Sequence, residues 1–158
     1  MNKIDSLQAA IVAALPELAN DPARLRMWID RGAAQSRQTE SLSFGFTYRL
    51  NILVLELASD IALLALAIFG WLRVNEPHLL APDTDGFSFD ADILDNRTAD
   101  ILIQIDVRQN VQVRAAEAGY SLEYLDEPDP LFPDMLGIVA GAPIPPLADV
   151  MTDTTADG

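Results

Sequence analysis

Five aspartates within twenty-one residues are the side chains of this sequence best suited to chemistry. Residues 87–107 read FSFDADILDNRTADILIQIDV and carry Asp90, Asp92, Asp95, Asp100 and Asp106. Carboxylates brought together on neighbouring strands can bind a hard cation such as Ca²⁺ or Mg²⁺, or can work as an acid–base pair. Whether this protein is an enzyme depends on which side of the fold these carboxylates occupy.

The spacing of these aspartates favours a solvated sheet face over a metal site. Asp90 and Asp92 alternate with apolar residues, and so do Asp100 and Asp106 after the turn signal Asp95-Asn96. Such alternation is typical of strands with one buried and one wet face. The spacing also differs from that of the twelve-residue calcium loop. We expect a solvated face, with an acidic contact surface and a metal site as the alternatives.

Other catalytic arrangements find little support in the sequence. The chain has no cysteine, and its single histidine, His78, follows Pro77 at an expected helix stop. Residues 137–141 contain two glycines but lack the lysine and the helix that follow a phosphate-binding loop. We therefore predict that the protein is not an enzyme, with no catalytic residue, cofactor or metal. A small metal-dependent enzyme built on the aspartates is the alternative from another class.

The charge of the chain is concentrated in its second half. The net charge is −14 over 158 residues. Residues 1–75 hold seven basic and seven acidic side chains, so residues 76–158 carry the whole excess. Such a chain is unsuited to binding DNA phosphates. The excess predicts solubility or a negative surface that partners or passing DNA would meet.

Hydrophobic periodicity predicts an α+β fold with a mostly antiparallel sheet and two main helices packed on it. The first half reads as a helix over residues 4–18, capped by Ser6 or Asp5 and interrupted at Pro16. A short strand over 25–30, a hairpin loop over 32–40 and a long strand over 41–57 follow. Gly45 suggests a bulge or a bend in the long strand.

The second half is expected to supply the other main helix and three more strands. The helix begins after Ser59 or Asp60 and runs to about Arg73. A hairpin then turns at Asp95-Asn96, and a last strand covers residues 120–125. Apart from Glu56, residues 52–57 are apolar on both faces of the strand, which predicts a strand buried on both sides.

The second helix is apolar almost all round. Residues 61–72 contain no polar side chain apart from the indole of a tryptophan, so this helix should be deeply buried or shared with another subunit. We expect Leu64 and Ile68 in the core, and Leu66 and Phe69 as candidate subunit contacts. The uninterrupted apolar run is too short to span a membrane, and we expect no membrane partner.

Residues 128–158 read as an extended proline-rich arm and an acidic, loose tail, following a single domain over residues 1–127. Prolines recur at six positions between 128 and 146. Apolar side chains without a core-like period lie between them and are candidate partner contacts: Leu131, Phe132, Met135 and Leu136.

Ordered blocks along residues 1–134 resemble a known family. The blocks are LQAAIVAALPEL with NDPARL, SFGFTYRLNILVLELASD, FGWLRVNEPHLL, GFSFDADILDNRTADILIQIDV and YSLEYLDEPDPLFPD. In their order and spacing they resemble the tail completion protein R (GpR) family of contractile-tailed temperate phages.

The resemblance implies a structural virion protein that acts at the end of tail assembly. It would cap the head-proximal end of the tail tube or, alternatively, sit in the neck as a head–tail connector. Related tail terminators are small α+β subunits that form hexameric rings, which implies a homo-oligomer, tail tube and neck partners, and DNA passing through without specific binding. Its expected location is the virion, and the host cytoplasm during assembly. The family supplies no catalytic residue.

Overall fold

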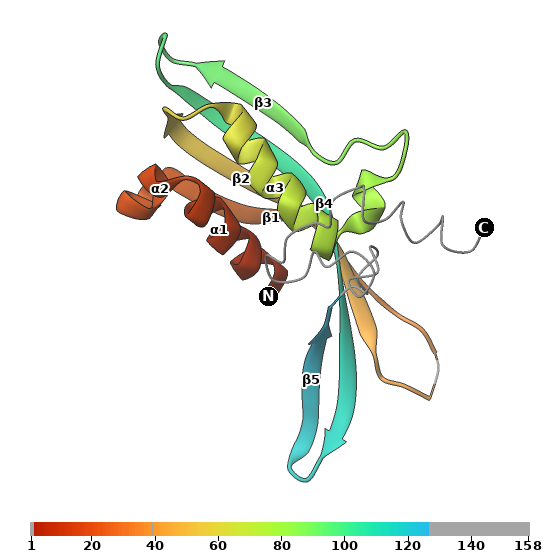
Figure 1. Cartoon of the computed structure of the whole chain (residues 1–158). Coiled ribbons are helices and arrows are strands. Elements are labelled where there is room, and N and C mark those ends of the chain that lie inside the picture. The colour runs from red at the N-terminus through yellow and green to blue at the C-terminus, as the bar shows by residue number, and fades with distance from the viewer. Residues whose placement is uncertain (1, 39, 127–158) are drawn as a thin grey trace, which may run out of the picture. The chain divides into compact units, whose positions relative to one another are not determined.

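A five-stranded antiparallel sheet with its helices on one face makes up the domain (Figure 1). The structure is a computed structural model that describes residues 2–38 and 40–126. The predicted α+β class and the order of helices and strands are confirmed. The predicted arm, with Leu131, Phe132, Met135 and Leu136, lies outside the described residues.

The strands are antiparallel in the order β1-β2-β4-β3, and β5 also pairs with β4. Their bounds are β1 Leu25–Ser36, β2 Phe44–Leu57, β3 Ser88–Ile93, β4 Ala99–Ala116 and β5 Gly119–Leu125. The helices are α1 Asn2–Ala14, α2 Pro16–Asn20 and α3 Ile61–Asn75, and two 3-10 turns, η1 Pro22–Arg24 and η2 Pro77–Leu80, complete the fold.

The core lies between the sheet and α1, α2 and α3. Alternate residues of β2 and β4 point to this side, because side chains of a strand face opposite sides of the sheet in turn. The helices contribute buried residues at spacings of three and four, as an amphipathic helix does. The fully buried members are Leu7, Ile11, Leu15, Leu18, Leu50, Ile52, Val54, Leu64, Ile68 and Leu72.

Helix α1 begins earlier than its sequence signals suggest. A start at Ser6 or Asp5 was expected, but the helix already includes Asn2. The Ser6 hydroxyl instead donates to the Lys3 carbonyl oxygen at 3.0 Å and accepts from the Trp71 indole at 2.8 Å. This side chain therefore joins α1 to α3 rather than capping α1.

Helix α3 is capped as predicted but is buried on one side only. The Asp60 carboxylate accepts a hydrogen bond from the Ala62 amide at 2.9 Å, as an N-cap residue does. Leu64 and Ile68 are fully buried, whereas Leu66 is 69% exposed. Of the two expected arrangements, deep burial on every side is wrong within the described residues, and sharing with another subunit stays a prediction. No helix among these residues combines the length and apolar character needed to cross a membrane.

Strand β1 is twice as long as the sequence indicated. A loop was predicted from Gly32, but β1 continues to Ser36 after a break in register between Asp30 and Ala33. Arg31, inside this break, has a φ of 51°. An extra residue in a bulge shifts the alternation of side chains, so the period-two signal disappears while pairing continues.

Gly45 is not at a bulge, the first of the two irregularities suggested for it. It pairs in regular register with Gln35 on one side and Asn110 on the other. A Cβ at this position would lie 2.9 Å from Asn110 Oδ1, so a larger residue would require the exposed Asn110 side chain to move. The irregularity of β2 falls instead between Val54 and Leu57, where Glu56 has a φ of 50°.

The end of β2 is covered on one face only. Leu53 and Leu55 point away from the helices and are partly exposed. Within the described residues no element covers this side of the sheet (Figure 1). The expected burial of residues 52–57 on both sides is therefore wrong for this part of the chain. We call this side, which faces away from the helices, the open face.

A buried ion pair fills a gap along the edge of β4. On this edge β3 pairs up to Gln104 and β5 starts at Asn110. The Glu76 carboxylate accepts from the Arg108 amide at 3.1 Å, and the Lys3 ammonium donates to the Arg108 carbonyl at 2.5 Å. The Lys3 Nζ to Glu76 Oε1 distance is 2.6 Å, and both side chains are buried. Side chains thus satisfy backbone groups that lack a strand partner.

Candidate interaction surfaces

Two of the five aspartates hold turns of the sheet in place. The Asp95 carboxylate accepts from the Arg97 and Thr98 amides at 2.7 and 2.8 Å, and these bonds lower the pKa of Asp95. The Asp100 carboxylate accepts from the amide of Glu56 at 2.8 Å, at the irregularity of β2. Both carboxylates therefore have structural partners of the kind found in turns and bulges.

The other three aspartates lie on the open face, as their alternation predicted. Asp90 and Asp92 are exposed, and Asp92 stands directly opposite Asp100 in the register of β3 and β4. Asp106 forms an ion pair with Arg49, with a Nε to Oδ1 distance of 3.0 Å. Among the described residues, no group of three or more histidine or acidic side chains is placed to hold a metal ion.

Polar side chains link three strands across the open face. The Asn51 side-chain amide donates to Asp30 at 2.7 Å and accepts from Gln104 at 2.9 Å, which joins β1, β2 and β4. One register step away, the Arg49 guanidinium donates two bonds to Asp106. These bonds raise the pKa of Arg49. The face is hydrogen-bonded to itself and offers hydrophilic contact area rather than a reactive group.

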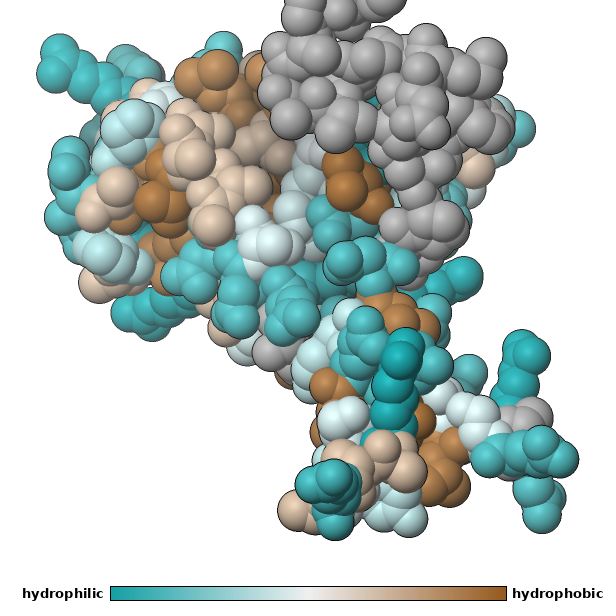
Figure 2. All heavy atoms as spheres, turned by 60° about the horizontal axis from the view of Figure 1, so that its bottom comes forward, coloured by the Kyte–Doolittle hydropathy of each residue, from teal (hydrophilic) through white to brown (hydrophobic). Residues whose placement is uncertain are grey.

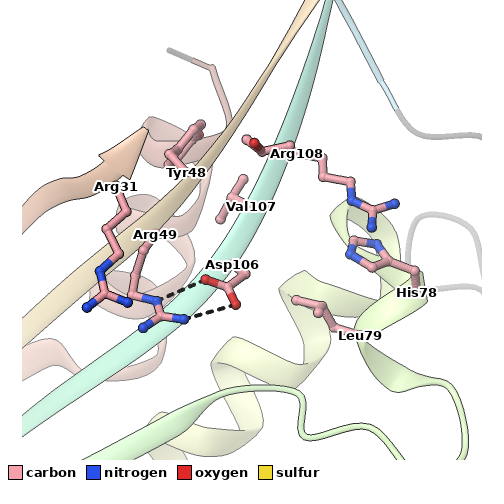
Figure 3. Close-up of a pocket in the computed structure, with 9 residues that line it drawn as sticks. Arg31, Tyr48, Arg49, His78, Leu79, Asp106, Val107 and Arg108 are labelled. Carbon is pink, nitrogen blue, oxygen red and sulfur yellow. Dashed lines mark hydrogen bonds and ion pairs between the residues drawn. The ribbon is translucent and has the colours of Figure 1, made fainter. Parts of the chain in front are cut away.

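A hollow of about 420 Å³ lies where β2 and β4 pass η2. In Figure 3, Arg31 and Arg49 lie on one side of β4, Asp106 lies over the strand, and His78 and the Arg108 guanidinium lie on the other side. The titratable groups of the hollow therefore do not converge on one point, which acid–base catalysis requires. Its cationic groups could contact a carboxylate of a partner.

Apolar side chains are exposed on α3 and on β3, on the helix side of the sheet. Leu63 and Leu66 are 47% and 69% exposed, and on β3 Phe89 and Ile93 are 55% and 75% exposed. A cavity of about 220 Å³ separates the two elements; we call it the α3–β3 groove, and its lining includes Ile61, Leu64, Ala65, Phe69, Phe87 and Phe89. Exposed apolar side chains next to an apolar groove are typical of sites of protein–protein contact.

Phe69 forms part of the groove wall. Its ring packs on Phe87 with centroids 4.9 Å apart, and it remains 42% exposed. A Cβ on Gly86 would come within 2.8 Å of the Phe69 ring, so glycine makes this arrangement possible. The two predicted contacts Leu66 and Phe69 are thus accessible on α3, and their contact with a subunit stays a prediction.

Two hairpins, β1–β2 and β4–β5, extend beyond the helices (Figure 1). Seen from the side of their tips, hydrophilic and apolar side chains are mixed on these projections (Figure 2). On β5, Tyr120 and Leu122 are 68% and 59% exposed. Large exposed side chains on a projecting hairpin offer a second surface suited to a protein partner.

Two comparisons with known proteins agree on the origin of the chain. The family profile "P2 phage tail completion protein R (GpR)" matches residues 1–128. The chain is also 33% identical over 133 residues to "Tail completion protein R" of Escherichia phage P2, covering 82% of this chain and 86% of that protein. The protein belongs to the GpR family. No solved structure matches it.

Membership of the GpR family makes the chain a structural phage tail protein and not an enzyme. The prediction of a non-enzyme is confirmed, and the metal-dependent enzyme alternative is wrong. The expected likeness to tail terminators in fold stays a prediction. The five aspartates of residues 87–107 instead accept hydrogen bonds from backbone amides, pair with arginine or face outward in this GpR protein.

Sequence reasoning missed the apolar surface on β3 of the GpR chain. It placed Phe89 and Ile93 on the core side, and they do pair with the buried Ile103 and the partly buried Ala99 of β4. Strand β3 lies at the edge, and α3 does not reach over it, so both remain exposed. Two signals for this exposed surface were available in the sequence. The strand is short, and the preceding helix has no polar stripe.

Proposed function

We propose that this GpR protein completes the tail at the head-proximal end of the tail tube, as a closed ring with six copies as the expected number. The exposed apolar surface of α3 and β3 carries this proposal. A surface of this composition is costly in water unless a second protein covers it. Contacts between unlike surfaces of identical copies produce closed rings when the rotation closes.

The arm supports the same proposal. We further propose that residues 128–158 form an extended arm and tail, and that the arm lies along a neighbouring subunit with Phe132 as its anchor. Apolar side chains spaced among prolines suit binding in an extended conformation, which loses little entropy on binding. Leu66, Phe69, Leu131, Met135 and Leu136 are the other proposed contacts.

The ring would contact the tail tube protein on one side and neck proteins on the other. The projecting hairpins are suitable elements for these contacts, because they extend beyond the helical layer. DNA would pass through without specific binding, since a net charge of −14 repels phosphate. The protein would assemble in the host cytoplasm before it enters the virion.

A neck connector on the head side is the second candidate. The same exposed surfaces would serve a ring that binds the head rather than the tube. The two candidates differ in what the isolated protein recognises, so binding to purified structures separates them.

Negative-stain images of the purified protein test the ring directly. We expect closed rings, and a monomer at all accessible concentrations would contradict the proposal. Infection with phage lacking this gene should yield heads and tails that fail to join. Added protein should then label the ends of isolated tails in the first case and the heads in the second.

A further inference from the structure

We propose that residues 134–139 of one copy add a strand to the free edge of β3 in a neighbouring copy, with their apolar side chains in the α3–β3 groove. This inference rests on the proposed function, because it requires several copies in one assembly. It identifies the surface that receives the arm and makes the arm the link between successive subunits.

The backbone of β3 offers an open edge. Strand β3, Ser88–Ile93, pairs with β4 through six register positions. Among the described residues, no strand pairs with its other edge. Unpaired N–H and C=O groups along such an edge are a template for an incoming strand, a mode of recognition known as β-strand addition.

The side chains next to this edge are apolar and accessible. Phe89, Ala91 and Ile93 alternate on the groove side of β3, and all three are exposed. The groove of about 220 Å³ has room for a few side chains and is lined by three phenylalanines. A strand laid along β3 would place every second side chain over this surface.

Residues 134–139 match this edge in length and composition. They read DMLGIV, six residues without proline, and Pro133 precedes them. Proline cannot donate to a ladder, so this segment is the part of the arm suited to strand pairing. Met135 and Val139 have one parity, and Leu136 and Ile138 have the other, so either register delivers two apolar side chains.

Donor and acceptor are different surfaces of the same chain. The contact is therefore head-to-tail, and such contacts close into a ring or extend into a filament. An arm that leaves one subunit and ends on the next also fixes the order of subunits around the ring. The arm thus provides a reason for the apolar edge of β3 to stay uncovered within its own domain.

Cross-linking between two full-length variants tests this assignment. The natural chain has no cysteine, so engineered thiols are unique. Chains carrying Ala91→Cys and chains carrying Leu136→Cys are purified apart, mixed and treated with a short bis-maleimide. We expect a heterodimer, at a yield at least tenfold above that of a mixture in which Ala9→Cys, on the exposed side of α1, replaces Ala91→Cys.

A second comparison isolates the groove. In the Ala91→Cys chain, an added Phe89→Glu should reduce the heterodimer at least tenfold, because a charge would face the arriving apolar side chains. An added Asp92→Asn, on the opposite side of the same strand, should change it less than twofold. Circular dichroism of both variants confirms that Phe89→Glu, at an exposed position, keeps the fold. Equal yields in the two variants would overturn the proposal.

A chain carrying both cysteines distinguishes a neighbour from the same copy. We expect a ladder of covalent oligomers that ends at the copy number of the ring. A cross-linked monomer that persists on dilution would overturn the proposal, because the arm would then return to its own domain. The joining of heads to tails is measured separately. If the ladder forms but the rings do not act on tails, only the proposed function is refuted. If the rings are active but the ladder does not form, the proposed arm contact is refuted.

Discussion

At the scale of single residues, the buried pair of Lys3 and Glu76 is the most consequential contact. It joins α1, the end of α3 and the backbone of β4 at Arg108. A buried charge that loses its partner is far more costly than the pair itself, because the remaining charge stays desolvated. Each partner is therefore required as long as the other is present.

Lys3→Met should destabilise the domain by about 3–5 kcal/mol, the usual cost of breaking a buried pair. Urea unfolding followed by circular dichroism measures this loss. Replacing both partners, Lys3→Met with Glu76→Leu, should recover only part of it, because no unpaired charge remains but the Arg108 amide and carbonyl lose their side-chain partners. If Lys3→Met lowered the free energy of unfolding no more than an exposed control such as Arg26→Met, the pair would not be buried in solution.

Glu17 links α2 to the turn before α3. Burial raises the pKa of the Glu17 carboxyl, but hydrogen bonds from Ser59, from the amide of Ala58 and from Arg24 together lower it below the ordinary value of 4.5. A carboxyl with a lowered folded-state pKa stabilises the fold above its unfolded pKa. This contribution is lost as pH falls through the folded pKa.

Glu17→Gln should therefore lower the melting temperature at pH 7 by a few degrees, roughly the effect of 1 kcal/mol. Below pH 4.5 the difference from the natural chain should shrink, because the natural carboxyl is then being protonated as well. Thermal scans between pH 7 and pH 3 measure it. Asp85→Asn, in an exposed loop, serves as control, and a difference that grows on acidification would contradict the assignment.

At the scale of elements, α3 has two faces with different tasks. Leu64 and Ile68 pack into the core, and Leu66 and Phe69 lie on its accessible face. An aspartate in the core leaves an unpaired buried charge, whereas an aspartate on an exposed face remains hydrated. The same substitution should thus separate stability from assembly along one helix.

Leu64→Asp and Ile68→Asp should give unfolded or insoluble protein, with a loss of at least about 4 kcal/mol. Leu66→Asp and Phe69→Asp should give soluble, folded monomers that do not complete tails. Circular dichroism, sizing chromatography and complementation of the defective phage check the four variants. Unfolding of all four, or normal assembly by the last two, would remove α3 from the proposed interface.

The sequence predicted the helices and strands better than the pairing and packing between them. Alternation placed Asp90 and Asp92 on the open face, and the Asp60 cap placed the start of α3, because these signals are local. The continuation of β1 past Asp30 escaped prediction, since a bulge breaks the period without ending the pairing.

Contacts between distant residues could not be predicted from one sequence. Lys3 resembled an ordinary surface lysine near the start of the chain, and only the fold brings it to Glu76. Similarly, the apolar pattern of α3 was compatible with burial on every side. Whether α1 and the sheet cover one side of α3 or its whole surface depends on how the elements pack together.

At the scale of the whole molecule, the domain and the proposed arm should separate experimentally. A chain truncated after Glu127 should remain folded, because the described core lies within residues 2–126. It should assemble poorly, with ring formation reduced at least tenfold. Circular dichroism and negative-stain images check both statements.

A chain truncated further, after Ala116, serves as a comparison because it also loses β5. Rings formed by the 127-residue chain as readily as by the full chain would contradict the arm. An unfolded 127-residue chain would show that the last residues belong to the core.

The buried ion pair of Lys3 and Glu76 at the edge of β4 also constrains how the chain can fold during synthesis. Lys3 reaches the carbonyl of Arg108, a separation of 105 positions, so the first helix cannot reach its final partners until most of the chain has been synthesised. Long-range contacts of this kind slow folding. A ribosome adds about 5–20 residues per second, so Lys3 would wait several seconds for the Arg108 carbonyl. Fragments released before β4 could pack α1 on α3 but would lack the Arg108 contact, so only nearly complete chains would hold the buried pair in its final surroundings.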